Sequence, residues 1–117
     1  MRRVVISGMG IYSCIGENLE EVKESLYKGT SGIVIDNERI EFGYRSPLTG
    51  MVKAPNLKNL LSRRQRISLG EEGEYAYVAT LEALKNAQIS EEFLDTHEIG
   101  ILYGNDSTAK SIIESND

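Results

Sequence analysis

The sequence contains too little of several residue types to support whole classes of function. It has one cysteine, so no internal disulfide can form, as is typical of proteins kept in a reducing compartment. Its single histidine, His97, leaves no cluster of the kind that holds a zinc ion. No apolar run approaches the length of a membrane span, and the apolar run at residues 4–6 is too short for a signal peptide. We therefore expect a cytoplasmic protein that carries neither a metal site nor a membrane segment.

Positive charge is also scarce relative to negative charge. The 13 basic residues are outnumbered by 18 acidic ones, which gives a net charge of −5 and a pI near 5.0. A general nucleic-acid binder normally needs a basic face, so the composition argues against that function. The apolar fraction of 40% permits a real core and argues against disorder. At 117 residues, the chain is one domain at most, or part of one.

Two apolar runs predict strands that are buried on both faces. The first is Val4, Val5 and Ile6, which leads into a turn spaced by Gly8, Gly10 and Gly16; the second is residues 99–103. Because the long connection between them contains helices, we expect a right-handed crossover that makes the two strands adjacent and parallel. This pattern predicts an α/β fold, although two strands cannot make an independent doubly wound sheet.

Capping signals and apolar spacing predict the helices. Asn18 and Glu21 mark the start of a helix that ends at Gly29, and Ser90 starts a short helix later in the chain. Residues 57–66 predict a short basic helix with Leu57, Leu60 and Leu61 facing inward. Residues 71–87 predict the longest helix, with small residues on one face that allow close packing against the strands. Short strands are expected at residues 33–35 and 51–53, and a final helix that begins at Ser107 is expected to contain Ile112 and Ile113.

The ordered set of motifs resembles the β-ketoacyl-acyl-carrier-protein synthases, the condensing enzymes of fatty-acid elongation. Residues 4–16, Val-Val-Ile-Ser-Gly-Met-Gly-Ile-Tyr-Ser-Cys-Ile-Gly, resemble the family's opening (V/I)(V/I)(S/T)G(M/L)G(I/V)xSxxG, and residues 29–33, Gly-Thr-Ser-Gly-Ile, resemble its G(K/R)SGI. Residues 43–46, 50–52 and 100–104 follow in the expected order. The resemblance therefore extends from Met1 to about Ser107.

This resemblance implies a thiolase-like fold, of which residues 1–117 form an incomplete amino-terminal part of the first half. The family's nucleophilic cysteine, two histidines and structural lysine lie beyond the region that matches Asp117. We therefore expect a truncated β-ketoacyl synthase domain that is inactive by itself. Cys14 lies in the glycine turn rather than in the family's nucleophile context, so we interpret it as a small half-buried filler. His97 is interpreted as a surface turn residue.

The resemblance also implies a reaction and its partners. An elongating synthase takes an acyl group onto a cysteine thiol and decarboxylates malonyl-carrier protein, and the resulting carbanion attacks the acyl thioester. The implied partner is the acyl carrier protein with its acyl- and malonyl-phosphopantetheine arm. The full-length protein is expected to be a homodimer, and no metal or redox cofactor is implied.

Two candidate sites follow from the matched positions. Arg63, Arg64 and Arg66, with Lys58 nearby, match the helix that helps family members to dock the acidic carrier protein. The alternative is a solvated helix face whose charges have partners three residues away.

The second candidate site is Ser107 and Thr108, which follow Asn105 and Asp106 in the turn after the second predicted strand. Carboxyl ends of parallel strands are where α/β folds generally bind ligands. In the family, this turn is usually glycine-rich and lies beside the acyl-chain pocket, and Ser107 matches a position that restricts acyl length in some members. Here Asn, Asp, Ser and Thr replace most of those glycines, so the resemblance does not fix a chain-length preference. The alternative role is a helix N-cap by Asp106 or Ser107.

Two other functions remain as alternatives. The strand followed by Gly8-x-Gly10 suggests a dinucleotide-binding domain, but that motif requires Gly or Ala at position 13, where this sequence has Ser13. A non-catalytic relative, similar to the chain-length-factor subunits, would keep this amino-terminal pattern and lack the nucleophile. Residues 1–117 do not separate that relative from an active synthase.

Overall fold

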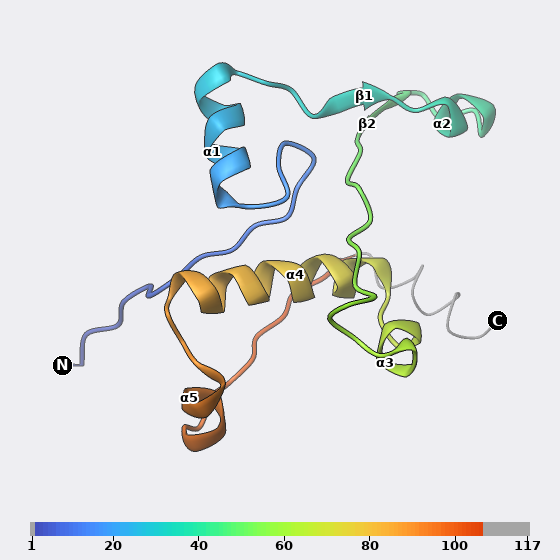
Figure 1. Ribbon diagram of the computed structural model, residues 1–117. Coiled ribbons are helices and arrows are strands. Elements are labelled where there is room, and N and C mark those ends of the chain that lie inside the picture. Colours follow the sequence, from blue (N-terminus) through green and yellow to red (C-terminus); the bar gives the residue numbers. More distant parts are fainter. Residues whose placement is uncertain (1, 107–117) are drawn as a thin grey trace. The chain divides into compact units, whose positions relative to one another are not determined.

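The computed structural model describes residues 2–106, which form two compact units. One unit is Ile11–Lys53, and the other holds the described residues before Ile11 and after Lys53. The first contains α1, β1, α2 and β2, and the second contains α3, α4 and α5 (Figure 1). No helix within the described residues is both long and apolar enough to cross a membrane.

In the unit Ile11–Lys53, α1 (Leu19–Lys28) has the predicted start and end. The side chain of Asn18 accepts a hydrogen bond from the backbone N–H of Glu21, with the two atoms 3.0 Å apart. The carboxylate of Glu21 reaches back to the backbone N–H of Glu17 at 2.8 Å, one residue before the position that a capping box uses. Gly29 ends the helix in the left-handed region at φ 66°, and Val22 is buried.

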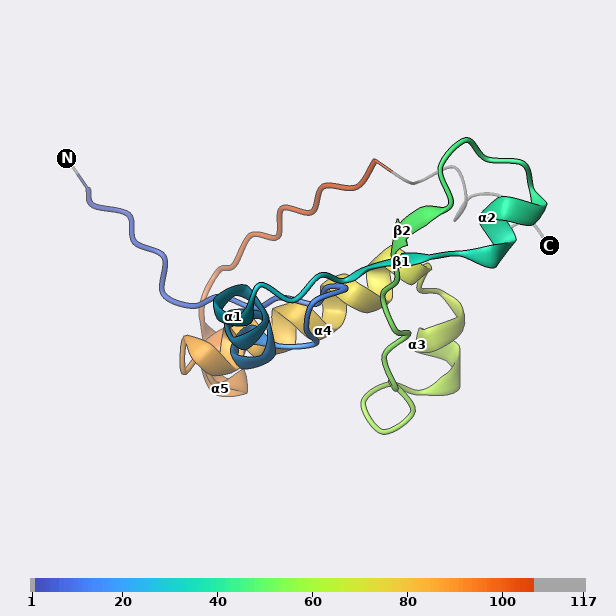
Figure 2. The ribbon, with the colours of Figure 1, turned by 90° about the horizontal axis from the view of Figure 1, so that it is seen from above.

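The same unit contains the only sheet among the described residues. Strand β1 (Ile33–Ile35) pairs antiparallel with β2 (Leu48–Gly50), so that Ile33 lies opposite Gly50, and α2 (Asn37–Glu41) connects them (Figure 2). The prediction of a strand at residues 33–35 is confirmed. The second short strand, expected at 51–53, lies three residues earlier, because residues 48–50 are the ones that pair with β1.

Two side-chain contacts hold the start of this unit to its end. The hydroxyl of Tyr12 donates to the carbonyl oxygen of Lys53 at 2.9 Å, and the ammonium of Lys53 lies 3.5 Å from the carboxylate of Glu17. Burial raises the pKa of Tyr12, and the negative charges of Glu17 and Glu21 raise it further. The phenol therefore stays neutral and available as a donor at ordinary pH.

The other unit is organised around α4 (Glu71–Asn86), which confirms the predicted long helix. It is preceded by α3 (Arg63–Ile67) and followed by α5 (Glu91–Thr96), where the side chain of Ser90 accepts from the N–H of Phe93 as the sequence predicted. Leu57, at 3% exposure, is the most buried apolar residue of this unit.

The glycines before Ile11 pack directly on the small-residue face of α4. A Cβ placed on Gly10 would lie 1.9 Å from the carbonyl oxygen of Ala79, and one on Gly8 would lie 2.6 Å from the Cβ of Ala87. Between these glycines, the backbone N–H of Met9 donates to the side-chain oxygen of Asn86 at 3.0 Å. The close approach therefore requires glycine at both positions.

The predicted parallel strand pair is not present. Residues 4–6 and 99–103 have no regular secondary structure, and the apolar side chains there are largely exposed, as shown by Val4 at 95% and Ile101 at 91%. A strand exists only through hydrogen bonds to a neighbouring strand, and the described residues supply none to either segment. An apolar run thus indicates a preference for burial, whereas its pairing as a β-strand depends on which other segments are available to it.

Candidate functional site

The basic segment begins as a helix at Arg63 because of a local capping box. Ser62 and Gln65 bond reciprocally: the N–H of Gln65 donates to the Ser62 hydroxyl at 3.3 Å, and the N–H of Ser62 donates to the Gln65 side chain at 3.0 Å. The predicted helix at 57–66 is therefore corrected to a turn at 58–60 followed by α3. The Ser-x-x-Gln spacing was a readable signal for this start.

The correction also changes the environment of the three leucines that were predicted to face inward. Leu57 is buried, Leu61 is half-buried and Leu60 is 52% exposed. Because Leu57 and Leu60 do not lie on one continuous helix, helical spacing does not place them on the same face. Among the three leucines, Leu57 is therefore the one that is fully buried in the unit.

The three arginines of α3 differ in how accessible they are. Arg63 and Arg64 are exposed, whereas Arg66 is half-buried and its Nε is shielded from solvent without a hydrogen-bond partner. Helix α3 contains no acidic residue, and no ion pair of these arginines occurs in the described part of the chain. The expected charge partners are thus absent from the described part of the chain, whereas the exposure of Arg63 and Arg64 fits both a docking surface and a solvated helix face. What remains is two accessible positive charges on an acidic chain.

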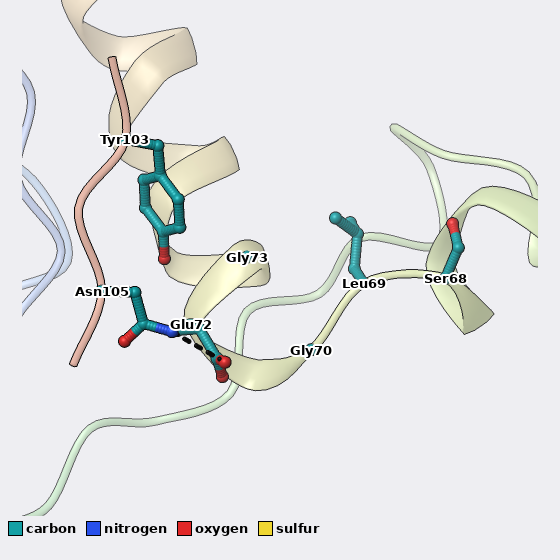
Figure 3. Close-up of a pocket in the computed structure, with 7 residues that line it drawn as sticks. All are labelled: Ser68, Leu69, Gly70, Glu72, Gly73, Tyr103 and Asn105. Atoms are coloured by element: carbon teal, nitrogen blue, oxygen red, sulfur yellow. Dashed lines mark hydrogen bonds between the residues drawn. The ribbon is translucent and has the colours of Figure 1, made fainter. Parts of the chain in front are cut away.

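The second candidate region lies in the same unit, where segment 103–106 passes the start of α4. A cavity of about 430 Å³ is lined by residues from the α3–α4 connection, the first turn of α4 and the extended segment (Figure 3). These residues are Ser68, Leu69, Gly70, Glu72, Gly73, Tyr103 and Asn105. The lining combines a carboxylate, an amide, a hydroxyl and two apolar or aromatic side chains.

A hydrogen bond links the two sides of this cavity. The Nδ2 of Asn105 donates to the Oε1 of Glu72 at 3.0 Å, across 33 residues of sequence (Figure 3). Glu72 lies in the first turn of α4, where the helix dipole favours a negative charge, and Gly70 provides no side-chain cap. Sequence reasoning missed Glu72, because no local pattern indicates a contact with a residue so distant in the chain.

The residues predicted to contact substrate, Ser107 and Thr108, lie outside the described residues, as does the final helix expected after them. Asn105 and Asp106 are described: Asn105 is half-buried and Asp106 is exposed. Of the predicted turn, Asn105 therefore lines the cavity at the start of α4.

The dinucleotide alternative is not supported by the environment of its glycines. Gly8 and Gly10 are covered by α4, and the first helix after them begins at Leu19, well outside the glycine motif. A pyrophosphate site needs a strand before the glycines and a helix that begins within them, so that backbone N–H groups are free. Neither element is present here.

Cys14 and His97 are the two other side chains of the sequence that could take part in catalysis, and both make packing contacts. Cys14 is half-buried, and its sulfur lies 2.7 Å and 3.1 Å from the positions that a Cβ would take on Gly32 and Gly50. His97 is exposed and stacks on the ring of Phe93, with ring centres 3.9 Å apart. Within residues 2–106, no three His, Cys, Asp or Glu side chains are grouped so as to hold a metal ion.

Comparison with known proteins places the chain in a family. Residues 1–117 match the family described as "Beta-ketoacyl synthase, N-terminal domain". The chain belongs to this family, which is the one that its ordered motifs resemble. Membership implies a thiolase-like α/β fold.

The individual relatives carry the name 3-oxoacyl-[acyl-carrier-protein] synthase. The chain is 40% identical to synthase 1 of Buchnera aphidicola subsp. Acyrthosiphon pisum over 105 residues, which cover 89% of this chain and 26% of that protein. It is 38% identical to synthase 1 of Haemophilus influenzae over 104 residues, with 89% and 25% covered. Synthase 1 of Escherichia coli K12 is 34% identical over 105 residues, with 89% and 26% covered. The chain thus spans about a quarter of the length of these relatives.

Proposed function

We propose that the intact protein is an elongating 3-oxoacyl-acyl-carrier-protein synthase of fatty-acid biosynthesis. The observation that supports this proposal most strongly is the family match over residues 1–117, together with relatives of that name at up to 40% identity. In the proposed reaction, a cysteine thiol outside this chain attacks the thioester of acyl-carrier protein, takes the acyl group and releases the carrier thiol. Malonyl-carrier protein then loses CO₂, and its carbanion attacks the acyl thioester, expels the thiolate and forms the 3-oxoacyl product.

Within this chain, Arg63, Arg64 and Arg66 are the proposed docking surface for acyl carrier protein. The two exposed arginines of α3 have no acidic partner among the described residues, so their field is available to an acidic partner. Charge complementarity of this kind mainly raises the encounter rate and fixes orientation. Arg66, which is half-buried, contributes more to the packing of α3 than to the outer surface.

Ser107 and Thr108 are the proposed acyl-contacting residues of this chain, by their match to the family's turn beside the acyl pocket. The protein would act in the cytoplasm as a homodimer, as the resemblance implies. These proposals concern the intact protein, because the chain covers about a quarter of its relatives.

A reconstituted assay tests the proposed function. The purified intact protein is incubated with acyl-carrier protein and malonyl-carrier protein, and the 3-oxoacyl-carrier protein and CO₂ are quantified by mass spectrometry and by release of labelled carbon. We expect product and CO₂ in equal amounts. Absence of both from a folded protein, across short and long acyl chains, would contradict the proposal and favour a non-catalytic relative.

A further inference from the structure

Helix α3 carries one exposed apolar side chain among its arginines. Ile67, the last residue of α3, is 73% exposed, although an isoleucine side chain gains free energy by leaving water. Local folding does not require isoleucine there, because a β-branched side chain forms helix less readily than the lysine or glutamate of an ordinary exposed helix face. What distinguishes Ile67 from apolar residues scattered singly over a surface is its position relative to the charges.

The helical geometry places Ile67 between the two exposed arginines. Successive residues of an α-helix are rotated by about 100°, so Ile67 lies about 40° around the axis from Arg63 and about 60° from Arg64. Each Cα–Cβ bond also tilts toward the amino end of the helix, which directs Ile67 over the turn that carries these arginines. The half-buried Arg66 lies about 100° away from Ile67. The exposed face of α3 therefore combines two guanidinium groups with an apolar side chain between them.

This combination of side chains defines the partner that the face fits. Helix α3 contains no acidic residue, and no ion pair of its arginines occurs in the described part of the chain, so the face complements an acidic protein. Exposed charge pairs add little affinity and act mainly on the association rate. An apolar contact that is desolvated within the interface acts instead on the dissociation rate. A complementary partner thus carries carboxylates beside an exposed apolar side chain.

We infer that Ile67 is the apolar anchor of the carrier-protein docking surface. Arg63 and Arg64 attract and orient the acidic carrier protein, and Ile67 packs against an apolar side chain that lies among its carboxylates. This inference rests on the proposed function, because the partner to which it commits is the acyl carrier protein of the proposed synthase. It adds a residue that controls the lifetime of the complex, whereas the arginines control its formation.

Two substitutions at position 67 and one matched control test the anchor in the intact protein. Ile67→Ala removes the apolar contact and keeps a residue that favours helix, whereas Ile67→Leu keeps both the volume and the apolar character. Ile40→Ala is the control, because it removes the same atoms from a 54% exposed isoleucine of another five-residue helix, α2. Arg64→Glu is the charge variant with which the binding kinetics are compared.

The first measurement is the kinetics of binding to immobilised acyl-carrier protein, by surface plasmon resonance. Ile67→Ala should raise the dissociation rate by about three- to thirtyfold and leave the association rate within about twofold of wild type. Added salt should not reduce this effect, whereas Arg64→Glu should lower the association rate by an amount that shrinks with salt. Ile67→Leu and Ile40→Ala should stay within about twofold of wild type in both rates. No binding by the intact protein, or equal dissociation rates of Ile67→Ala and Ile40→Ala, would overturn the inference.

The second measurement is thermal unfolding, which reports whether Ile67 lies on the surface of the intact protein. The melting temperature of Ile67→Ala should lie within about 2 °C of wild type, because truncation of an exposed side chain changes stability little. A larger fall would show that the rest of the intact protein covers Ile67, and the inference would be wrong.

The binding data also separate this inference from the proposed function. If the wild-type protein forms no 3-oxoacyl product but binds carrier protein, and dissociation is faster only in Ile67→Ala, the proposed function fails while the anchor stands. If the wild-type protein forms product and Ile67→Ala dissociates at the wild-type rate, the anchor fails and the proposed function stands.

Discussion

At the scale of single residues, the described chain depends on a few close approaches that only small side chains allow. Gly10 lies against the carbonyl of Ala79, and Cys14 lies between Gly32 and Gly50. These contacts explain the glycine-spaced opening sequence in packing terms. They also assign Cys14 a packing role, in agreement with its position outside the family's nucleophile context.

Gly10→Ala should destabilise the protein, because its Cβ would lie 1.9 Å from the oxygen of Ala79. Overpacking of this kind typically costs about 1–3 kcal/mol of unfolding free energy. Thermal or urea unfolding of the purified protein measures the loss. Gly100→Ala is the control, since a Cβ there meets nothing within 4 Å. Equal stability of the two variants would show that the contact between Gly10 and α4 does not form.

Cys14→Ala should leave condensation by the intact protein within a fewfold of wild type. Alanine fits the space that the Cys14 side chain occupies beside Gly32 and Gly50, and the proposed reaction assigns no step to Cys14. The control variant Gly50→Ala adds a methyl group 3.1 Å from that sulfur, and it should be less destabilising in the Cys14→Ala background. Loss of activity by more than about a hundredfold in a folded Cys14→Ala protein would assign it to the chemistry.

At the scale of elements, the helix α3 presents charge and the helix α4 organises its unit. The capping box of Ser62 and Gln65 starts α3 directly at the arginines, so the two exposed guanidinium groups lie on its first turn. The half-buried position of Arg66 changes the choice of residues for a docking test. Arg63 and Arg64 are the residues whose reversal should affect docking most directly.

Reversal of Arg63 and Arg64 to Glu in the intact protein should raise the KM for acyl-carrier protein. Each exposed contact contributes at most about 1 kcal/mol, so each reversal should raise KM by no more than about fivefold to tenfold. The effect should shrink as salt is added, because screening weakens exposed charge pairs. Lys85→Glu is the control, because it changes an exposed charge of the same sign on α4.

Activity on a small acyl-pantetheine substrate separates docking from folding in this experiment. It should be nearly unchanged in the Arg63 and Arg64 reversals, because that substrate lacks the acidic carrier protein. Arg66→Glu, in contrast, should lower the melting temperature, since it places a carboxylate in a half-buried position. If carrier-protein and pantetheine substrates lose activity equally with Arg63→Glu and Arg64→Glu, the docking assignment is wrong.

At the scale of the whole molecule, the described chain has little enclosed core. Val22 and Leu57 are its buried apolar residues, whereas Val4, Ile6, Ile101 and Leu102 are each more than four-fifths exposed. So many exposed apolar side chains favour association with the surface of another protein molecule or chain segment. This surface is consistent with a chain that spans about a quarter of its relatives.

The 117-residue chain by itself should therefore self-associate and should form no 3-oxoacyl product. Self-association follows from the exposed apolar segments, and it is measured by size-exclusion chromatography with light scattering over a range of concentrations. Absence of turnover is expected because the resemblance implies that the family's nucleophile and histidines are not among residues 1–117. A monomer at all concentrations would contradict the first expectation, and turnover that Cys14→Ser abolishes would contradict the second.

Features that depend on neighbouring residues were predictable from the amino-acid sequence. Asn18 and Gly29 define α1, Ser90 begins α5, and small residues at helical spacing mark α4, because caps and helical periodicity act within a few residues. The family was also readable from the sequence, since its motifs are local and ordered.

Contacts between distant segments, in contrast, were not predictable from local sequence. The apolar runs at 4–6 and 99–103 indicated strands, but an apolar run does not specify which segment a strand pairs with. The predicted pairing of these two runs is absent from the described residues. The contact of Gly10 with Ala79 and the hydrogen bond of Glu72 to Asn105 join residues 69 and 33 positions apart. No local propensity encodes such contacts, because their free energy is gained only after the intervening chain has folded to bring the partners together.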